Sequence, residues 1–369
     1  MTGRLTVVLD EVGERSTTMV GRYGAEIARA LVATAPDGFE VAGLAARISP
    51  AREERVHALV PGLAELRQTA VPARELRQAW LRSLTTLPVR GLVHSTSLLA
   101  PTGLDAGTGD QVTVTLHGLQ PLSDRSERKA RWFERALHRS VRRADGIVVP
   151  TTAVAEDLAE RFDVGDRARV IHPAPAAWLR APEDDAGTVR RLGLPDEYVL
   201  AVTSPGARGQ AERLVATVAS RSMPDVRVVV AGPVSWGETT LAALAVEAGI
   251  PAGRIIMVGD LDDADLAVAY ARALAHLHVS EADALGLTLL EAAALGTPTV
   301  HAATRSLLEI GGEASVPVVG GPDRLAASLG RLLDDGDERT RLGLHAQDRA
   351  RAFTWEAAAA QVWQLHAEL

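Results

Sequence analysis

Short apolar runs alternate with amphipathic helical patterns along the whole chain. The runs are rich in Val, Ile and Leu and do not alternate strictly with polar residues, which is typical of strands covered on both faces. They lie at 5–9, 41–44, 92–94, 112–116, 147–149 and 170–171, and again at 199–202, 226–231, 255–258, 274–279, 299–301 and 316–319. Helical patterns such as 25–33 and 241–248 separate them. The chain therefore predicts repeated βαβ units that build parallel sheets.

Two sets of such units predict two domains. A length of 369 residues exceeds one typical hydrophobic core, and a stretch rich in Pro and Ala at 172–185 separates the two sets. We predict an α/β protein with Rossmann-like domains at 1–178 and 179–352, and a terminal helix at 353–369 that either returns to the first domain or packs on the second. Because parallel sheets bind ligands at the carboxyl ends of their strands, the two domains are expected to face a central cleft.

Composition narrows the classes of function. Apolar residues make up 47% of the chain and charged residues 23%, as in an ordinary globular protein. The chain has no cysteine, which excludes disulfides, thiolate catalysis and cysteine-based metal sites. No apolar stretch is long enough to span a membrane, and the first residues lack the pattern of a signal peptide. We therefore expect a cytoplasmic protein.

Charge is distributed unevenly. Residues up to Trp178 include 23 basic and 21 acidic side chains, whereas the remainder includes 16 and 26. The first half is expected to face an anionic partner, although a net charge of −8 argues against nucleic acid. Eight of the basic residues lie in 125–143, where apolar positions recur at helical spacing. The charged face of this predicted helix is either solvated or docked as a peripheral contact on anionic lipid at the inner face of the plasma membrane.

The segment 280–298 carries the most specific pattern in the chain. It reads S-E-A-D-A-L-G-L-T-L-L-E-A-A-A-L-G-T-P and follows a buried strand. Gly286 is predicted to open a helix whose first amides, including those of Leu287 and Thr288, point toward an anion such as a phosphate. Glu291 lies one turn into this helix, where its carboxylate can accept hydrogen bonds from both hydroxyls of a ribose. The pattern predicts a nucleotide site.

This segment resembles the E-x7-E element of the retaining glycosyltransferases of family 4, which have the GT-B fold of two Rossmann-like domains. Other segments occur in the order of that family: Gly-Arg-Tyr at 21–23, T-L-H-G-L at 115–119, R-A-D-G-I-V-V-P-T at 143–151 and S-L-L-E-I-G-G-E-A at 306–314. The first two are similar to the mannosyltransferase-like branch. The resemblance implies transfer of a sugar from a nucleotide-diphosphate donor.

The resemblance also implies roles for individual residues. Arg208 and the amides at Gly286 would hold the departing diphosphate without a metal ion, and Asp283 would bind hydroxyls of the donor sugar. His117 would lie at the reacting face, with a histidine packed in the core as the alternative. The other implied donor contacts are Glu291, Leu287, Thr288, Ser204, Gly259 and Gly21.

Three positions depart from the family pattern. Asp283 replaces the first glutamate of the acidic pair and is shorter by one methylene, roughly 1.5 Å of reach. Ser204 lies nearest to the position of an arginine and brings no charge, and Met19 occupies a position that is often glycine. Glu281 either compensates for the short side chain of Asp283 or is a solvated loop residue.

The Asp263-Ala264-Asp265 segment resembles the D-x-D motif of metal-dependent glycosyltransferases. It precedes a helical pattern, however, and acidic residues favour the start of a helix. We therefore predict no metal ion and no cofactor apart from the donor substrate.

The leading hypothesis is a metal-independent retaining glycosyltransferase. It would move a hexose, with mannose from GDP-mannose as the expected donor, to a glycan or glycolipid acceptor. A degenerate GT-B protein that binds a nucleotide or a partner enzyme without catalysis is the alternative, favoured by Met19, Ser204 and Asp283. A nucleotide-sugar epimerase is a further alternative, which the register of the acidic pair argues against. The sequence does not define the sugar, the acceptor or the oligomeric state.

Overall fold

The computed structural model describes residues 3–14, 18–82, 89–101, 109–119, 127–204, 208–236 and 239–369. Within these ranges the chain divides into two compact units. Unit 1 contains the described residues up to Pro173 together with the final segment Thr354–Leu369, and unit 2 is Ala174–Phe353. No helix in the described ranges is long and apolar enough to cross a membrane.

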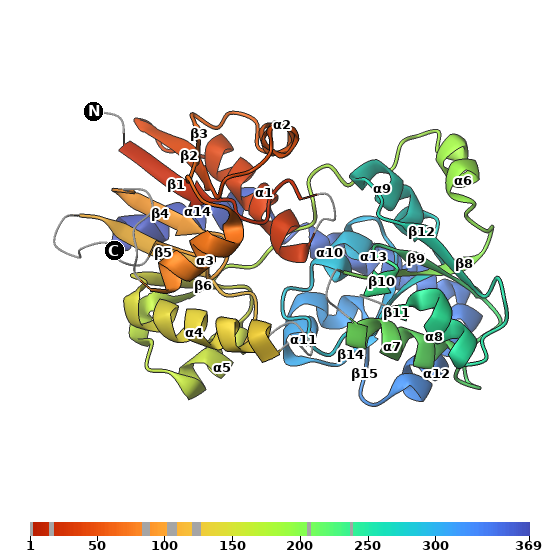
Figure 1. The fold of residues 1–369 in the computed structure, drawn as a ribbon. Helices are drawn as coiled ribbons and strands as arrows, with labels where there is room; N and C mark the ends of the chain where they lie inside the picture. Colours follow the sequence, from red (N-terminus) through yellow and green to blue (C-terminus); the bar gives the residue numbers. More distant parts are fainter. Residues whose placement is uncertain are drawn as a thin grey trace. The chain divides into compact units, whose positions relative to one another are not determined.

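Unit 1 is built on a parallel sheet of seven strands in the order β3-β2-β1-β4-β5-β6-β7 (Figure 1). The interior strand β1 pairs with β2 from Gly3↔Phe39 to Val8↔Leu44 and with β4 on its other side. The strands are β1 (Gly3–Val8), β2 (Phe39–Ala45), β3 (Leu66–Gln68), β4 (Leu92–Ser95), β5 (Gln111–Thr115), β6 (Gly146–Val149) and β7 (Ala168–Val170).

Six helices accompany this sheet in the described residues. Hydroxyl side chains cap several of them: Thr18, Ser49 and Thr151 each accept a hydrogen bond from a backbone amide three residues ahead. The helices are α1 (Met19–Ala33), α2 (Pro50–Leu59), α3 (Ala73–Leu81), α4 (Glu127–Arg143), α5 (Thr152–Arg161) and α14 (Trp355–Glu368).

The last helix belongs to unit 1 although it follows unit 2 in sequence. In Figure 1 the blue α14 lies among the red-to-yellow elements of unit 1. Trp355 packs edge-on against Tyr23 of α1, with ring centroids 5.4 Å apart. His366 Nε2 lies 3.1 Å from Thr113 Oγ1 in β5, and the pair is buried. Helix α14 is thus part of the unit 1 core.

Unit 2 is built on a parallel sheet of six strands in the order β12-β9-β8-β13-β14-β15. Alternate side chains enter two apolar clusters. One includes Val228 and Leu277 with residues of α7 and α12, and the other includes Tyr198 and Leu200 with residues of α9. The strands are β8 (Tyr198–Val202), β9 (Arg227–Ala231), β12 (Ile255–Gly259), β13 (Ala275–His278), β14 (Thr299–Ala302) and β15 (Val316–Val318).

The helices of unit 2 cover both faces of its sheet, as the two clusters require. A short antiparallel ribbon, β10 (Ser235–Trp236) with β11 (Thr239–Thr240), precedes α8. The helices are α6 (Ala186–Leu192), α7 (Arg208–Val218), α8 (Leu241–Glu247), α9 (Asp263–Ala271), α10 (Leu287–Ala294), α11 (Arg305–Gly311), α12 (Pro322–Asp334) and α13 (Gly336–Ala350).

The prediction of two α/β units with parallel sheets is confirmed. Each of the twelve apolar runs overlaps a strand. The sequence analysis missed β3, since Leu66–Gln68 is short, contains two polar residues and pairs only with β2 at the sheet edge. Edge strands of this kind lack the apolar signal of a strand that is covered on both faces.

Candidate functional site

The predicted donor residues of unit 2 gather at one edge of its sheet. Strands β8 and β13 are neighbours, and the chain leaves β8 toward β9 on the opposite side, so the sheet order reverses between them. Ligands of open parallel sheets bind at such a point. Ser204 and Arg208 follow β8, and Asp283 and Gly286 follow β13. Gly259 ends β12 two strands away from β8.

Backbone contacts at this edge are unusually close. Gly232 follows β9, and its amide donates to Gly259 O at 2.8 Å. Gly232 has φ +102°, and a Cβ there would lie 2.3 Å from Thr203 O. Gly259 also has a positive φ, +76°, but nothing lies within 4 Å of its added Cβ. Glycine at 232 is therefore required by both conformation and space, whereas at 259 it is required by conformation alone.

Asp283 shapes the turn that opens α10. Its Oδ1 accepts hydrogen bonds from Leu285 N at 2.8 Å and Gly286 N at 3.0 Å. Gly286 then adopts φ +65° as the residue before the helix, and an added Cβ would lie 3.2 Å from Ile310. The carboxylate thus holds a left-handed glycine turn, a local role that the sequence analysis did not assign to it.

The first amides of α10 have no hydrogen-bond acceptor among the described residues. The first bond of the helix runs from Leu290 N to Gly286 O, so the N–H groups of Leu287, Thr288 and Leu289 precede the regular ladder. Such groups and the helix dipole favour an anion at this end. The amides of Leu287 and Thr288 belong to buried residues and precede the regular ladder, whereas the Gly286 amide is already bound by Asp283. The role of Leu287 and Thr288 as diphosphate contacts stays a prediction.

His278 contacts residues on both sides of this turn. The sequence analysis did not identify it. It is buried at the end of β13. Its Nε2 lies 3.4 Å from Asp283 Oδ2, and its Nδ1 lies 3.1 Å from Thr288 Oγ1. Burial lowers the pKa of His278, and the Asp283 carboxylate opposes this shift. His278 therefore lies between the two sides of the glycine turn, close to Asp283 and Thr288, an arrangement that has no signal in the sequence.

Glu291 is fully buried. The Tyr270 hydroxyl donates to Glu291 Oε2 at 3.4 Å and lies 3.3 Å from Thr288 O. Glu291 lies one turn into α10, and its role as a ribose contact stays a prediction.

Two ion pairs involve arginines of α7, one within the helix and one to the loop before Asp283. Arg208 Nε lies 2.8 Å from Glu212 Oε1 on the same helix, and both side chains are partly exposed. Glu281 Oε1 lies 2.7 Å from an Arg213 guanidinium nitrogen. Glu281 is therefore exposed but ion-paired, which fixes the loop before Asp283 on α7.

The Asp263-Ala264-Asp265 segment forms the first turn of α9, where acidic residues are favourable. Asp262 caps this helix by accepting from Asp265 N at 2.9 Å. Arg191 donates to both carboxylate oxygens of Asp265, at 2.8 and 2.5 Å. These contacts give Asp265 a structural role in joining α6 to α9.

In unit 1, His117 follows the carboxyl end of β5. Its Nε2 donates to Thr96 O at 2.8 Å, and its ring packs edge-on against Tyr23 with centroids 4.8 Å apart. Burial lowers the pKa of His117 to about 4, although the bond to Thr96 opposes this. Nδ1 has no hydrogen-bond partner among the described residues. His117 is thus a neutral imidazole that can accept a hydrogen bond at Nδ1.

Gly21 and Met19 lie in the first turn of α1. The Gly21 amide donates to Thr18 Oγ1 at 2.9 Å. A Cβ at Gly21 would lie 2.7 Å from Glu11 O, so glycine allows α1 to pack closely on the loop after β1. Met19 is the first residue of α1 and is partly exposed. These contacts explain Gly21 by packing, whether or not it also contacts a donor.

Asp10 is a further buried carboxylate that sequence analysis missed. It follows β1, next to β4, where the order of the unit 1 sheet reverses. Arg77 donates to Asp10 Oδ2 at 3.0 Å, and Arg52 donates to its main-chain oxygen. Burial raises the pKa of Asp10, with Arg77 opposing the shift. Because its partners Arg52 and Arg77 come from α2 and α3, no local sequence pattern predicts that Asp10 is buried and ion-paired.

Comparison with known proteins identifies the family to which the chain belongs. The profile described as Glycosyltransferase Family 4 matches residues 20–174, and the profile described as Glycosyl transferase-like matches 208–364. A D-inositol 3-phosphate glycosyltransferase of Corynebacterium aurimucosum is 30% identical over 313 residues, which cover 78% of this chain and 68% of that protein. The chain belongs to glycosyltransferase family 4.

Other family 4 relatives match over a smaller share of their length. The D-inositol 3-phosphate glycosyltransferase of Salinispora tropica is 33% identical over 66% of this chain and 55% of its own length. That of Corynebacterium glutamicum is 31% identical over 60% and 57%, respectively. The chain thus spans little more than half the length of these curated relatives.

Solved structures match the fold over its whole length. Sucrose-phosphate synthase from Thermosynechococcus elongatus superposes with a TM-score of 0.78 at 21% identity and covers 99% of this chain and 98% of that one. WaaG, a glycosyltransferase involved in lipopolysaccharide biosynthesis, gives a TM-score of 0.71 at 16% identity, covering 97% and 98%. The predicted GT-B fold is therefore confirmed.

Proposed function

We propose that this family 4 protein is a metal-independent retaining glycosyltransferase that transfers a hexose from a nucleotide-diphosphate sugar. The start of α10 carries the proposal, because unbonded amides of Leu287, Thr288 and Leu289 lie at the reversal point of a parallel sheet. Fixed N–H dipoles of this kind stabilise negative charge that develops on a leaving group, which is usually the largest contribution to catalysis.

The roles of the other residues follow from charge and position. Arg208 begins α7 beside the same strand end, so its guanidinium can supply the positive charge that a departing diphosphate needs. Glu291 is the proposed ribose ligand. Asp283 Oδ1 is engaged by two amides, which leaves Oδ2 as the oxygen for a hydroxyl of the donor sugar. His117 is the proposed contact at the reacting face, through Nδ1.

The names of the relatives bear on the acceptor. Those relatives are named for D-inositol 3-phosphate, which favours a phosphorylated polyol as the acceptor over the glycan or glycolipid expected from the sequence. GDP-mannose remains the donor that we propose to test first, with UDP-hexoses beside it. A lipid acceptor would bring the enzyme to a membrane surface, where the basic segment 125–143 would supply the peripheral contact.

A donor panel tests the proposal. Purified protein is incubated with GDP-mannose, UDP-glucose, UDP-N-acetylglucosamine, ADP-glucose or dTDP-glucose, each with inositol 3-phosphate or with a lipid extract, and release of nucleotide diphosphate is measured with and without EDTA. Turnover that persists in EDTA supports the proposal. A strict requirement for Mg²⁺ or Mn²⁺ would contradict it and would return Asp263 and Asp265 to consideration as ligands.

Nucleotide binding provides an independent measurement. Glu291→Ala should weaken the affinity of the preferred nucleotide by roughly 1.5–3 kcal/mol, the range for hydrogen bonds to a charged group. Glu247→Ala, an exposed change in α8, is the matched control. Unchanged affinity in a folded Glu291→Ala protein would remove this residue from the site.

One observation favours the alternative of a degenerate protein without catalysis. One oxygen of the Asp283 carboxylate already accepts two backbone hydrogen bonds in the turn. It predicts nucleotide binding that depends on Glu291 but no turnover with any donor in the panel. Restoration of turnover by Asp283→Glu would then show that the site has lost its catalytic reach.

A further inference from the structure

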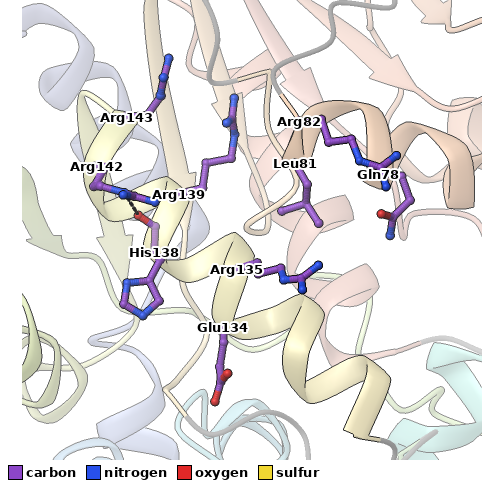
Figure 2. Close-up of a pocket in the computed structure, with 9 residues that line it drawn as sticks. All are labelled: Gln78, Leu81, Arg82, Glu134, Arg135, His138, Arg139, Arg142 and Arg143. Atoms are coloured by element: carbon purple, nitrogen blue, oxygen red, sulfur yellow. Dashed lines mark hydrogen bonds between the residues drawn. The ribbon is translucent and has the colours of Figure 1, made fainter.

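A basic hollow lies between α3 and α4 in unit 1. The hollow has a volume of about 630 Å³, and one side of it is open to solvent. Figure 2 shows Arg135 and Arg139 extending from α4 on the side where Leu81, the last residue of α3, and the following Arg82 lie, whereas Glu134 points away from them. Its lining residues are Gln78, Leu81, Arg82, Glu134, Arg135, His138, Arg139, Arg142 and Arg143.

Positive charge in the hollow is poorly neutralised. Five of its nine lining residues are arginines and one is a glutamate. Within the part of the chain that the structure describes, Arg82, Arg135, Arg142 and Arg143 form no ion pair with a carboxylate. By contrast, Arg4 on the same unit contacts two glutamates. Five arginines gathered in one concave place with a single lining carboxylate favour an anionic ligand.

Arg139 lies close to two other guanidinium groups of the hollow. The pKa of Arg139 is lowered first by burial and then by the neighbouring guanidinium groups of Arg143 and Arg142. Helix α4 therefore holds like charges close together at a free-energy cost that an anion would relieve. Guanidinium groups pair with phosphate oxygens through parallel N–H bonds, which makes phosphate the best-matched anion.

The hollow is held by a packed scaffold. The apolar face of α4, including Ala136, Leu137 and Val141, is buried within unit 1. Arg77 of α3 lies over the Trp132 ring of α4 at 5.9 Å. Because Ala136, Leu137 and Val141 are buried and Trp132 and Phe133 are partly buried, the side of α4 that faces the solvent is mainly its cationic side. This differs from the interfacial helix considered from the sequence, which uses both faces.

The hollow is also separate from the proposed reaction centre. Helix α4 ends at Arg143, just before the amino end of β6, whereas His117 follows the carboxyl end of β5. Strands β5 and β6 are parallel neighbours, so Arg142 and Arg143 lie toward the sheet edge opposite to His117. None of the lining residues is a proposed donor or acceptor contact.

We propose that the α3–α4 hollow is a binding site for a phosphate-bearing anion, either the headgroup of an anionic lipid or a soluble phosphate ester. The proposal goes beyond the proposed glycosyl transfer and does not depend on it, because binding is measurable in the absence of donor and acceptor.

The test uses the full chain and three variants. Arg135→Gln/Arg143→Gln removes two charges from the hollow, and Arg90→Gln/Arg161→Gln removes two exposed charges of unit 1 outside it. Arg208→Ala reports any binding at the proposed donor site. One arm measures inorganic pyrophosphate by calorimetry at low and physiological salt. The other measures retention on vesicles of phosphatidylcholine with phosphatidylglycerol, against phosphatidylcholine alone.

The hollow variant should lose about tenfold in affinity for its ligand, as expected for the loss of charge-assisted hydrogen bonds. Arg90→Gln/Arg161→Gln and Arg208→Ala should retain that binding. Loss in the pyrophosphate arm identifies a soluble ester, and loss confined to the anionic vesicles identifies a lipid headgroup. Equal loss in the hollow variant and the Arg90/Arg161 control, loss in Arg208→Ala alone, or no binding in either arm would overturn the proposal.

Discussion

The carboxyl edges of the two sheets are built in different ways. In unit 2 the edge is shaped by backbone: Gly232 and Gly259 end neighbouring strands, and Gly286 opens α10 in a left-handed turn. In unit 1 the corresponding edge is shaped by side chains from distant elements, such as Arg77 on Asp10 and His117 on Thr96 O. The first edge carries amides that precede the helical ladder of α10, and the second carries buried side-chain polar atoms such as Asp10 Oδ1 and His117 Nδ1.

This difference suits different ligands. Backbone N–H groups held in a turn cannot rotate away, so they recognise a charged group that is common to all donors, such as a diphosphate. Side chains on a rigid sheet can be exchanged without altering the backbone, so they provide the variable part of recognition. We therefore expect donor binding to be sensitive to backbone changes in unit 2, and acceptor choice to depend on side chains in unit 1.

The largest effect that we predict tests the backbone edge. Gly232→Ala should lower the free energy of unfolding by about 3–5 kcal/mol, because it adds a clash with Thr203 O to the strain of a positive φ. Gly259→Ala should lower it by only about 1–2 kcal/mol, since its Cβ meets no atom. Denaturant unfolding of both variants measures the difference. Equal losses would show that the close approach at Gly232 does not restrict the edge.

The next effect concerns the turn at Asp283. Asn at this position keeps an oxygen for Leu285 N and Gly286 N but loses the charge. Asp283→Asn should therefore leave the melting temperature and nucleotide affinity nearly unchanged, while transfer falls about a hundredfold, as for the loss of one stabilising group at a reacting centre. Asp283→Glu should also lower transfer by overfilling the turn.

Wild-type turnover in Asp283→Asn would reduce Asp283 to a turn-forming residue. Unfolding of that variant would show that the charge, through its 3.4 Å approach to His278 Nε2, also holds the local structure.

The sequence predicts features of this molecule that depend on neighbouring residues, but not those that depend on contacts between distant segments. Twelve of the strands and the helix that follows the 280–286 loop were predicted because their signals are local: apolar runs, and a glycine after an acidic loop. The contacts of His278, the Arg213–Glu281 pair and the Arg77–Asp10 pair were not predicted. Each joins residues that only the packed sheet and helices bring together, so no spacing in the sequence encodes it.

Buried histidines in each unit predict a similar dependence on pH. Burial lowers the pKa of His366 in unit 1 and of His301 in unit 2 to about 4. These two histidines are therefore protonated below about pH 6.5 in the unfolded chain, but only below about pH 4 in the folded protein. Stability is complete above pH 6.5 and should fall by about 1–2 kcal/mol per histidine by pH 5.

Thermal unfolding between pH 7 and 5 measures this loss. His366→Gln should reduce the loss in unit 1 by the share of one histidine, because buried His117 also has a lowered pKa there, and His301→Gln should do the same in unit 2. His57→Gln on the exposed side of α2 is the control substitution. A profile that is flat in the wild-type protein would mean that both imidazoles accept protons in the folded state.

The smallest predicted effect separates charge that serves the fold from charge that serves a ligand. Arg208 and Glu212 are partly exposed, and exposed pairs at this spacing contribute only about 0.3–0.5 kcal/mol. Glu212→Gln should therefore change the free energy of unfolding by less than about 0.5 kcal/mol. A cation in the first turn of a helix is unfavourable for the helix itself, so Arg208 is better explained by an anion that binds beside it.

Glu212→Gln releases Arg208 from its ion pair and should strengthen binding of a nucleoside diphosphate by about twofold in calorimetry, with EDTA present. Arg208→Ala should weaken this binding. If both variants bind as the wild type does, Arg208 is a surface residue and the amides of α10 hold the diphosphate without it.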